Sequence, residues 1–261
     1  MKILLLSQYY PPEIGAGSVR TSETAKYFRL MGHEVCVLTT FPNYLLEKPI
    51  SKYKKKQILV EKINGITVFR VYSLHFLKKK VGRFFSFFNF MLASIFMSRH
   101  LENADILIAT SPPFSLGISG FIISKILRTK FIFEVRDLYP ATAVELEVIN
   151  SKWIIRLLTT IENYVYGRAD GIITVTEGIY KQIKNKKINN NICLVYNGAD
   201  PVFFKTNIAQ SKNSGLDKNS ITLLNVGILG KIHGLETIIH ALSMMKMDNI
   251  SLKFVGDGVE Q

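Results

Sequence analysis

Short apolar runs alternate with amphipathic stretches along most of this chain, and that alternation limits the possible folds more than any other feature. The apolar runs have the length of strands, and the stretches between them have the spacing of amphipathic helices. The order strand, helix, strand is typical of βαβ units and a parallel sheet. The runs FIFEV at 131–135 and GIITV at 171–175 are apolar nearly throughout, which favours strands covered on both faces. We therefore predict an α/β fold.

The predicted elements follow this alternation in order. We expect strands at residues 3–6, 34–38, 66–71, 106–109, 131–135, 172–175, 192–195, 221–226 and 251–255. We expect helices at residues 18–31, 83–101, 114–127, 152–168, 177–185 and 235–247.

A polar stretch divides the chain into two parts. Residues 205–220 contain Asn, Ser and Lys with little periodicity, which is typical of a linker. We expect a first domain at 1–204 and a second domain at 221–261, joined by this linker. Only about 40 residues follow the linker, whereas domains usually need about 50 or more. We therefore expect the chain to end inside its second domain.

The cysteines and the N-terminus indicate the compartment. Cys36 and Cys193 lie far apart without CxxC spacing, so we expect a reducing compartment and no metal site. The apolar run ILLL at 3–6 is too short for the core of a secretory signal peptide. No run reaches the roughly 18 apolar residues that a spanning helix needs. These observations predict a cytoplasmic protein.

Positive charge is concentrated in one part of the chain. The net charge is +13, and residues 48–83, which we call the basic segment, hold eleven Lys and Arg against one acid, Glu61. A solvated face explains many such runs, but this density favours an anionic partner, either nucleic acid or anionic lipid. The chain has no RNA-recognition signature, zinc-finger spacing or basic region with heptads, so we expect no nucleic acid to bind.

The end of the basic segment runs into a mostly apolar stretch. Residues 84–97 carry six Phe, with a narrow polar stripe of Ser86, Asn89 and Ser94. A helix of this length spans about 21 Å, too little to cross a bilayer core of roughly 30 Å. It is either buried against the sheet or placed in a membrane interface, and the adjacent charge favours the interface. We expect contact with an anionic membrane surface through Lys78, Lys79, Lys80, Arg83, Phe84, Phe85 and Phe88.

The segment Gly15-Ala16-Gly17 joins the first predicted strand to the first predicted helix. It lacks the third glycine of the dinucleotide fingerprint, because Arg20 stands there, and no acid ends the second strand. No P-loop pattern occurs either. The segment is therefore either a phosphate cradle built from N–H groups at the helix start or a tight strand-to-helix turn. Its spacing alone leaves both interpretations open.

Several segments, taken in order, resemble a known family. They are PPEIGAGSVRTSETAKYFRLMGHEVCVLTTFPNY, SPPF, FEVRDLYPATAVEL, VTEGIYKQI, YNGAD and VGILGKIHGLETIIHAL followed by FVGDG. They resemble the retaining glycosyltransferases of family four, and within these the L-fucosamine-transferase-like branch of capsule and O-antigen synthesis. The resemblance covers the whole chain. It implies the GT-B fold, in which two Rossmann-like domains hold the acceptor and the nucleotide-sugar donor.

The resemblance implies roles for residues of the first domain. Gly15 and Gly17 would approach the donor diphosphate, and Arg20 would reinforce the positive charge there. Arg136 and Asp137 follow the strand predicted at 131–135 and are the expected catalytic residues, with a local ion pair as the alternative. We name no catalytic base, because the family retains configuration without a clear protein nucleophile.

Three further residues have two interpretations each. Glu177 would contact a sugar hydroxyl, or it favours the start of its helix through the helix dipole. Lys231 and His233 would bind donor phosphates, or they are surface residues without a role. Where the family has a basic pair, this chain has Ile228 and His233. The family's E-x(7)-E donor motif would lie beyond Gln261, so we expect an incomplete donor site.

The sequence therefore predicts a transferase that moves a sugar from a nucleoside diphosphate to a saccharide on a polyprenyl diphosphate carrier. It would work at the inner face of the cell membrane, in surface polysaccharide synthesis. The family needs no metal, and no DxD cluster is present, so we expect no cofactor. Two alternatives stay open: a non-catalytic acceptor-binding or membrane-binding lobe left by an interrupted gene, and a sugar-nucleotide epimerase of the same architecture.

Overall fold

The structure is a computed structural model that describes residues 1–42, 51–53, 56–73, 80–199, 220–227, 229–230, 233–245 and 249–258, without the side chains of 51 and 80–84. The chain forms two compact units, Met1–Asn197 and Gly198–Gln261, which we describe separately. The predicted linker at 205–220 lies outside the described residues except for Ser220. The predicted domain limits therefore stay predictions.

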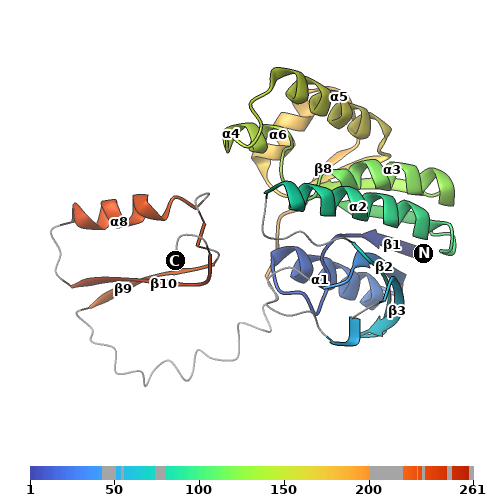
Figure 1. Cartoon of the computed structure of the whole chain (residues 1–261), viewed down its shortest axis with the longest axis horizontal. Helices are drawn as coiled ribbons and strands as arrows, with labels where there is room; N and C mark the ends of the chain where they lie inside the picture. The colour runs from blue at the N-terminus through green and yellow to red at the C-terminus, as the bar shows by residue number, and fades with distance from the viewer. Residues whose placement is uncertain are drawn as a thin grey trace. The chain divides into compact units, whose positions relative to one another are not determined.

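The first unit contains one large sheet with helices on both faces (Figure 1). Among its described residues, eight strands follow the spatial order β3-β4-β2-β1-β5-β6-β7-β8, and only β3 runs antiparallel to its neighbour. The strands are β1 (Lys2–Leu6), β2 (Glu34–Thr40), β3 (Ile58–Ile63), β4 (Ile66–Val71), β5 (Ile106–Thr110), β6 (Lys130–Val135), β7 (Gly171–Thr174) and β8 (Ile192–Leu194). The helices are α1 (Ala16–Leu30), α2 (Lys80–Ser98), α3 (Ser115–Leu127), α4 (Ala141–Glu145), α5 (Lys152–Arg168) and α6 (Glu177–Asn185), with a 3-10 turn η1 (Ser51–Tyr53).

The central strand β1 divides the core into two halves. Ile3 and Leu5 belong to a buried cluster that includes Ala25 of α1, whereas Leu4 and Leu6 belong to a cluster built with α2, α3, α5 and α6. Successive side chains of a strand point to opposite faces, so the apolar run ILLL supplies both halves of the core. The helix α1 therefore covers one face of the sheet, and α2, α3, α5 and α6 cover the other.

The predicted α/β fold is confirmed, and several element limits agree closely. The strands β4 and β9 (Ile221–Val226) and the helices α5 and α6 have the predicted limits. The helix α2 begins three residues before the predicted start, and α8 (Leu235–Ser243) ends before the predicted end at 247. The short helix α4 and the strand β3 were not predicted.

The strand β3 forms an antiparallel hairpin with β4 at the edge of the sheet. Its turn is Asn64-Gly65, with φ values of 51° and 77°. Asn-Gly is the preferred pair for a two-residue hairpin loop, because both residues need positive φ. The pair was the available signal for this strand, which alternates exposed and half-buried residues as an edge strand does.

A buried arginine ties this hairpin to the sheet. Arg70 of β4 is fully buried, and its Nε donates to Glu61 Oε1 at 2.6 Å. Its other nitrogens donate to the carbonyl oxygens of Thr40, at 2.9 Å, and of Pro11. Lys52 bonds the second oxygen of Glu61 from the solvent side. Two cations of the basic segment therefore stabilise the fold, and Arg70 presents no charge to a partner.

The described residues of the second unit form a strand, a helix and a strand. The strands β9 and β10 (Ile250–Val255) pair in parallel, and α8 lies between them in sequence. The strand β9 leads into Gly227, whose N–H donates to the carbonyl of Val255 at 3.0 Å. The helix α8 starts after Gly234, which has a left-handed conformation.

We predict that Arg70→Ala lowers the free energy of unfolding by about 3–5 kcal/mol, because it leaves the Glu61 carboxylate buried without its partner. The matched control is Lys52→Ala, which removes the exposed partner of the same carboxylate and should cost at most about 1 kcal/mol. Urea denaturation followed by circular dichroism measures both variants. Equal costs would show that burial of Arg70 does not decide the stability of this edge.

Candidate anion-binding site at the carboxyl edge of the sheet

The loops after β1, β5, β6, β7 and β8 lie at the carboxyl ends of parallel strands. Ligands of open α/β sheets bind at this edge, where the strand order reverses. In this sheet the reversal falls at β1, since β2 follows it on one side and β5 on the other. The loop that starts at Ser7, after β1, and the loop that starts at Ser111, after β5, therefore flank the expected binding crevice. The loop that starts at Arg136 follows β6, the next strand of the sheet.

The start of α1 is an open helix N-terminus. Gly15 is the N-cap residue, with φ 139° and ψ 159°, a conformation that glycine adopts and other residues avoid. No side chain caps the helix, and its first turn holds no acid. The Oγ of Ser18 is buried and has no hydrogen-bond partner among the described residues. The first N–H groups of α1 therefore have the arrangement that binds an anion.

The guanidinium of Arg136 lies next to this helix start. A β-carbon placed on Gly17 would stand 3.7 Å from Arg136 Nη1 and 3.4 Å from the ring of Tyr9. Arg136 is the first residue after β6, and its backbone N–H donates to Ser111 Oγ at 3.2 Å. The glycine at position 17 thus lets a cation from the β6 loop approach the first turn of α1.

The charge of Arg136 is half-buried and has no counter-ion bonded to it. Its guanidinium donates no hydrogen bond to any residue that the structure describes. Burial has the largest effect and lowers the pKa of Arg136; the charge of Glu134 raises this pKa, that of Arg20 lowers it, and that of Asp137 raises it. An arginine stays protonated at neutral pH in spite of such a shift. A partly desolvated cation without an acceptor is best satisfied by an anionic ligand.

Arg20 faces the same edge, but its charge is already paired. Its Nε and Nη2 donate to Glu134 Oε1 at 2.8 Å and 2.5 Å, and its Nη1 donates to Asn197. Thr110 donates to the other oxygen of Glu134 at 2.5 Å. This network joins α1, β5, β6 and the segment after β8.

Glu134 and Asn197 were missed as members of the site by the sequence analysis. The available signal for Glu134 was that it is the single acid inside the apolar run FIFEV. Because this run is predicted to be buried on both faces, the carboxylate needs a partner. The sequence analysis gave Asn197 no role of its own, only a place in the segment YNGAD. Nothing in its sequence context indicates its contact with Arg20, because 177 positions separate the two residues.

The other predicted site residues, apart from the membrane contacts, lie at several places in the two units or outside the described residues. Asp137 is exposed next to Arg136. Glu177 lies in the first turn of α6, where it accepts from Lys181 at 2.8 Å and from the Tyr196 hydroxyl at 3.3 Å. His233 belongs to the second unit, is exposed, and donates its N–H to the Gly230 carbonyl at 2.9 Å. Lys231 and Ile228 lie outside the described residues.

The predicted membrane residues are described in part. Phe85 and Phe88 are exposed on α2, with 55% and 47% of their surface accessible. The backbone of Lys80, Arg83 and Phe84 lies within α2, but their side chains are outside the description. Lys78 and Lys79 lie outside the described residues altogether. In the described part of the chain, no helix is long and apolar enough to cross a membrane.

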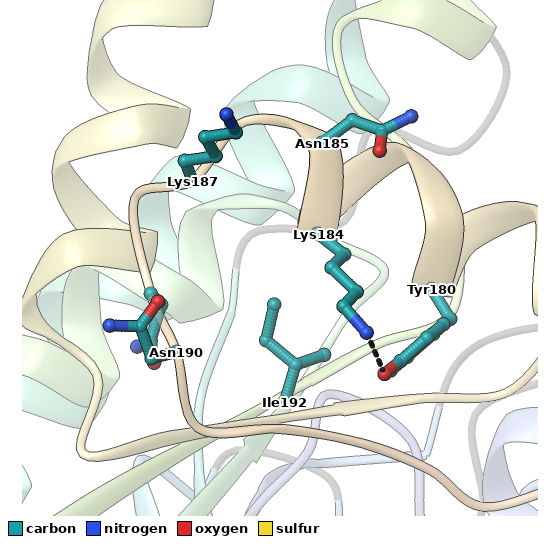
Figure 2. Close-up of a pocket in the computed structure, with 7 residues that line it drawn as sticks. Tyr180, Lys184, Asn185, Lys187, Asn190 and Ile192 are labelled. Carbon is teal, nitrogen blue, oxygen red and sulfur yellow. Dashed lines mark hydrogen bonds between the residues drawn. The ribbon is translucent and has the colours of Figure 1, made fainter.

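A pocket of about 380 Å³ lies between α6 and the start of β8 (Figure 2). Figure 2 shows the Lys184 ammonium donating to the Tyr180 hydroxyl, at 3.1 Å, beside Ile192. The residues that line the pocket are Tyr180, Lys184, Asn185, Lys187, Asn189, Asn190 and Ile192. Ile192 is the first residue of β8, so this pocket lies at the amino edge of the parallel sheet. None of the predicted site residues lines it.

Among the residues that the structure describes, no group of three or more His, Cys, Asp or Glu could hold a metal ion. The described groups at the carboxyl edge that can donate hydrogen bonds to a phosphate are N–H groups, a guanidinium and hydroxyls. Such groups bind and stabilise phosphate oxygens without proton transfer.

The chain matches the Glycosyltransferase Family 4 description over residues 17–203, which is most of its length. It belongs to glycosyltransferase family 4. The matched residues begin at Gly17 and include Arg20, Glu134, Arg136 and Asn197, so the whole network at the carboxyl edge falls within the family region.

Two curated relatives carry glycosyltransferase names. A probable glycosyltransferase WbjE of Pseudomonas aeruginosa is 21% identical over 184 residues, covering 66% of this chain and 44% of that protein. An uncharacterized glycosyltransferase MJ1069 of Methanocaldococcus jannaschii is 25% identical over 263 residues, covering 99% of this chain and 64% of that protein. The chain thus spans less than two thirds of the length of either relative.

Solved structures with the GT-B fold resemble this chain. The sucrose-phosphate synthase of Thermosynechococcus elongatus superposes with a TM-score of 0.68 at 14% identity, covering 98% of this chain and 62% of that one. HepE of Anabaena, solved with UDP and glucose, gives a TM-score of 0.57 at 16% identity, covering 99% and 62%. These similarities confirm the predicted fold class.

The two glycines at the start of α1 should respond differently to alanine. Gly15→Ala forces a side chain into a conformation that only glycine adopts readily, so we expect a loss of about 1–3 kcal/mol of unfolding free energy. Gly17→Ala adds a methyl group at ordinary contact distance inside a helix, so its stability should stay within about 1 kcal/mol of the parent. Urea denaturation measures both. A destabilised Gly17→Ala and an unaffected Gly15→Ala would contradict the geometry of this helix start.

Proposed function

We propose that this chain acts in a retaining glycosyltransferase that moves a sugar from a nucleoside-diphosphate donor to a saccharide on a polyprenyl diphosphate carrier. The observation that carries the proposal is the unpaired guanidinium of Arg136 beside the uncapped N-terminus of α1. Membership of family 4 supports sugar transfer. The UDP and glucose in the structure of HepE support a nucleotide-sugar donor.

The proposed catalysis relies on stabilising the leaving diphosphate. Breaking the bond between the sugar and the diphosphate leaves negative charge on the departing phosphate oxygen. Preorganised donors aimed at such charge contribute most to catalysis when water is excluded. We assign this role to the first N–H groups of α1 and to Arg136. Asp137, exposed beside Arg136, would accept a hydrogen bond from a hydroxyl of the sugar or the acceptor.

Arg20 has a supporting part in this proposal. Because Glu134 neutralises it, Arg20 holds α1 against β6 and adds little net charge toward the phosphates. Gly15 and Gly17 give the phosphates access to the helix start. Glu177, Lys231 and His233 remain candidates for contacts with the sugar and the donor phosphates, and the reaction is proposed to need no metal or other cofactor.

The proposed acceptor is lipid-linked, and the protein would associate peripherally with the cytoplasmic face of the cell membrane. The basic segment and the aromatic start of α2 support this association. The likeness to the L-fucosamine-transferase-like branch supports a role in O-antigen or capsule synthesis.

The proposed transfer is tested with radiolabelled UDP-sugars and a saccharide on polyprenyl diphosphate. We expect label in the lipid product, and Arg136→Ala should lower the rate by about a hundredfold, because it removes a donor to the leaving group. The control is Lys130→Ala, which changes an exposed cation at the amino end of β6, away from the carboxyl edge.

Each other outcome of this assay would overturn the proposal. Acceptor binding without transfer from any donor would favour a non-catalytic lobe. Epimerised free nucleotide sugar, formed without acceptor, would favour an epimerase. An undiminished rate in Arg136→Ala would exclude Arg136 from the catalytic machinery.

The basic segment should bind the membrane through its charge. Replacing Lys78, Lys79 and Lys80 by Glu changes the net charge by six and should release the protein from vesicles that contain phosphatidylglycerol. Co-sedimentation at physiological salt measures the bound fraction, and neutral phosphatidylcholine vesicles are the control. Unchanged binding of the triple variant would mean that these lysines do not face the membrane.

A further inference from the structure

The helix α2 buries its hydroxyls and exposes several of its large apolar side chains, whereas Phe90 and Met97 belong to the core. Ser86, Ser94 and Ser98 are buried, and Ser94 and Ser98 donate to carbonyls within the helix, Met91 and Ile95. On the outside, an exposed row recurs every three or four residues and so lies along one side of the helix: Phe85, Phe88, Leu92 and Phe96. About half of the surface of each side chain in this row is accessible.

The helix α5 repeats this pattern. Its acid, Glu162, is buried and bonded to the Tyr166 hydroxyl at 2.9 Å and to Lys186. Its exposed apolar residues are Trp153, Ile154, Leu157 and Tyr164. Trp153 has 71% of its surface accessible. Large aromatic side chains that gather on an exposed face indicate an interaction surface.

These two rows belong to one layer of the molecule. Buried residues of α2, α3 and α5 lie in the same core cluster, so the three helices cover the same face of the sheet (Figure 1). Between the rows, Phe121 of α3 meets Tyr164 of α5 edge to face, with ring centroids 5.6 Å apart. We call the outward side of these three helices the outer helical face.

Cations are interleaved with the aromatic rings of this face. The Lys125 ammonium lies 5.5 Å from the centroid of Phe121, and the Arg168 guanidinium lies 5.1 Å from that of Tyr164. Apart from the buried Glu162, the three helices contain no acid. The exposed acids Glu145 and Glu147 precede α5 and lie outside these helices. The cations of the three helices are Lys80, Arg83, Lys125, Lys152, Arg156 and Arg168.

We propose that the outer helical face lies on an anionic lipid surface, with Trp153 at the level of the headgroups and α2 and α5 as two separate contacts. Aromatic residues favour this level of a bilayer, and cations beside them pair with lipid phosphates. A second copy of the chain fits the face less well, because a symmetric contact would bring these cations against one another. This proposal deepens the proposed function and rests on it, because the proposed acceptor is bound to the membrane.

Trp153 makes this orientation directly measurable, because it is the only tryptophan of the chain. We expect its fluorescence to shift to shorter wavelength when the full chain binds phosphatidylglycerol vesicles, and brominated lipids should quench it. Phosphatidylcholine vesicles should produce neither effect. No donor or acceptor sugar is present, so a failure here would leave the transfer assay and its conclusion untouched.

Matched variants locate the contact on the two helices. Phe88→Ser with Leu92→Ser on α2, and Leu157→Ser with Arg156→Glu on α5, should each weaken vesicle binding by about tenfold or more. The control is Leu30→Ser with Met31→Ser, which changes two exposed apolar residues at the end of α1, on the opposite face of the sheet. Circular dichroism checks that each variant is folded.

Two results would overturn the proposal. Vesicle-bound protein with unshifted, unquenched tryptophan emission would mean that another surface meets the lipid. A shift that grows with protein concentration and needs no lipid would instead assign the outer helical face to a second copy of the chain.

Discussion

The ion pair between Arg20 and Glu134 holds together the edge of the sheet at which the strand order reverses. Arg20 comes from the second turn of α1 and Glu134 from the interior of β6, and both side chains are largely shielded from water. Thr110 and Asn197 complete the network from β5 and from the segment after β8. Arg20 and Arg136 both lie near the carboxylate of Glu134, and Arg20 forms the ion pair with it. Among the described residues, the guanidinium of Arg136 therefore has no hydrogen-bond acceptor beside the start of α1, which makes this edge suited to phosphate.

A second buried arginine shapes the same edge from the other side. Arg70 donates to the carbonyl of Pro11 in the loop after β1 and to the carbonyl of Thr40 at the end of β2. The side chain of Arg70 on β4 therefore fixes both the loop after β1 and the end of β2. The basic segment thus contains cations with different roles. Arg70 stabilises the fold, whereas the lysines at the end of the basic segment are the proposed membrane contacts.

Much of the fold could be predicted from the sequence, because parallel strands buried on both faces are nearly continuous apolar runs. The limits of α5 and α6 were predicted correctly because polar residues stand directly before both helices. Unlike the parallel strands of the core, the edge strand β3 is not buried on both faces, because its side chains alternate between exposed and half-buried positions. Its six residues also lie inside a basic stretch, and the strand was missed for these two reasons. For the site, the positions of Gly17 after the first predicted strand and of Arg136 after the strand predicted at 131–135 placed both at the carboxyl edge of the sheet, and their roles stay predictions. The pairing of Arg20 was not predictable, because its partners lie 114 and 177 positions away.

The position of β1 in the sheet has a consequence for synthesis of the chain. This first strand pairs with β2, but its other neighbour is β5, so Ile3 aligns with Ile106. The N–H of Lys2 likewise donates to Asp105 at 2.7 Å. On a ribosome, one side of the central strand therefore stays unpaired until more than a hundred residues have been made. Contacts of such high sequence separation slow folding and prolong the exposure of apolar strands. The nascent first unit is consequently a natural client for chaperones that shield unpaired strand edges.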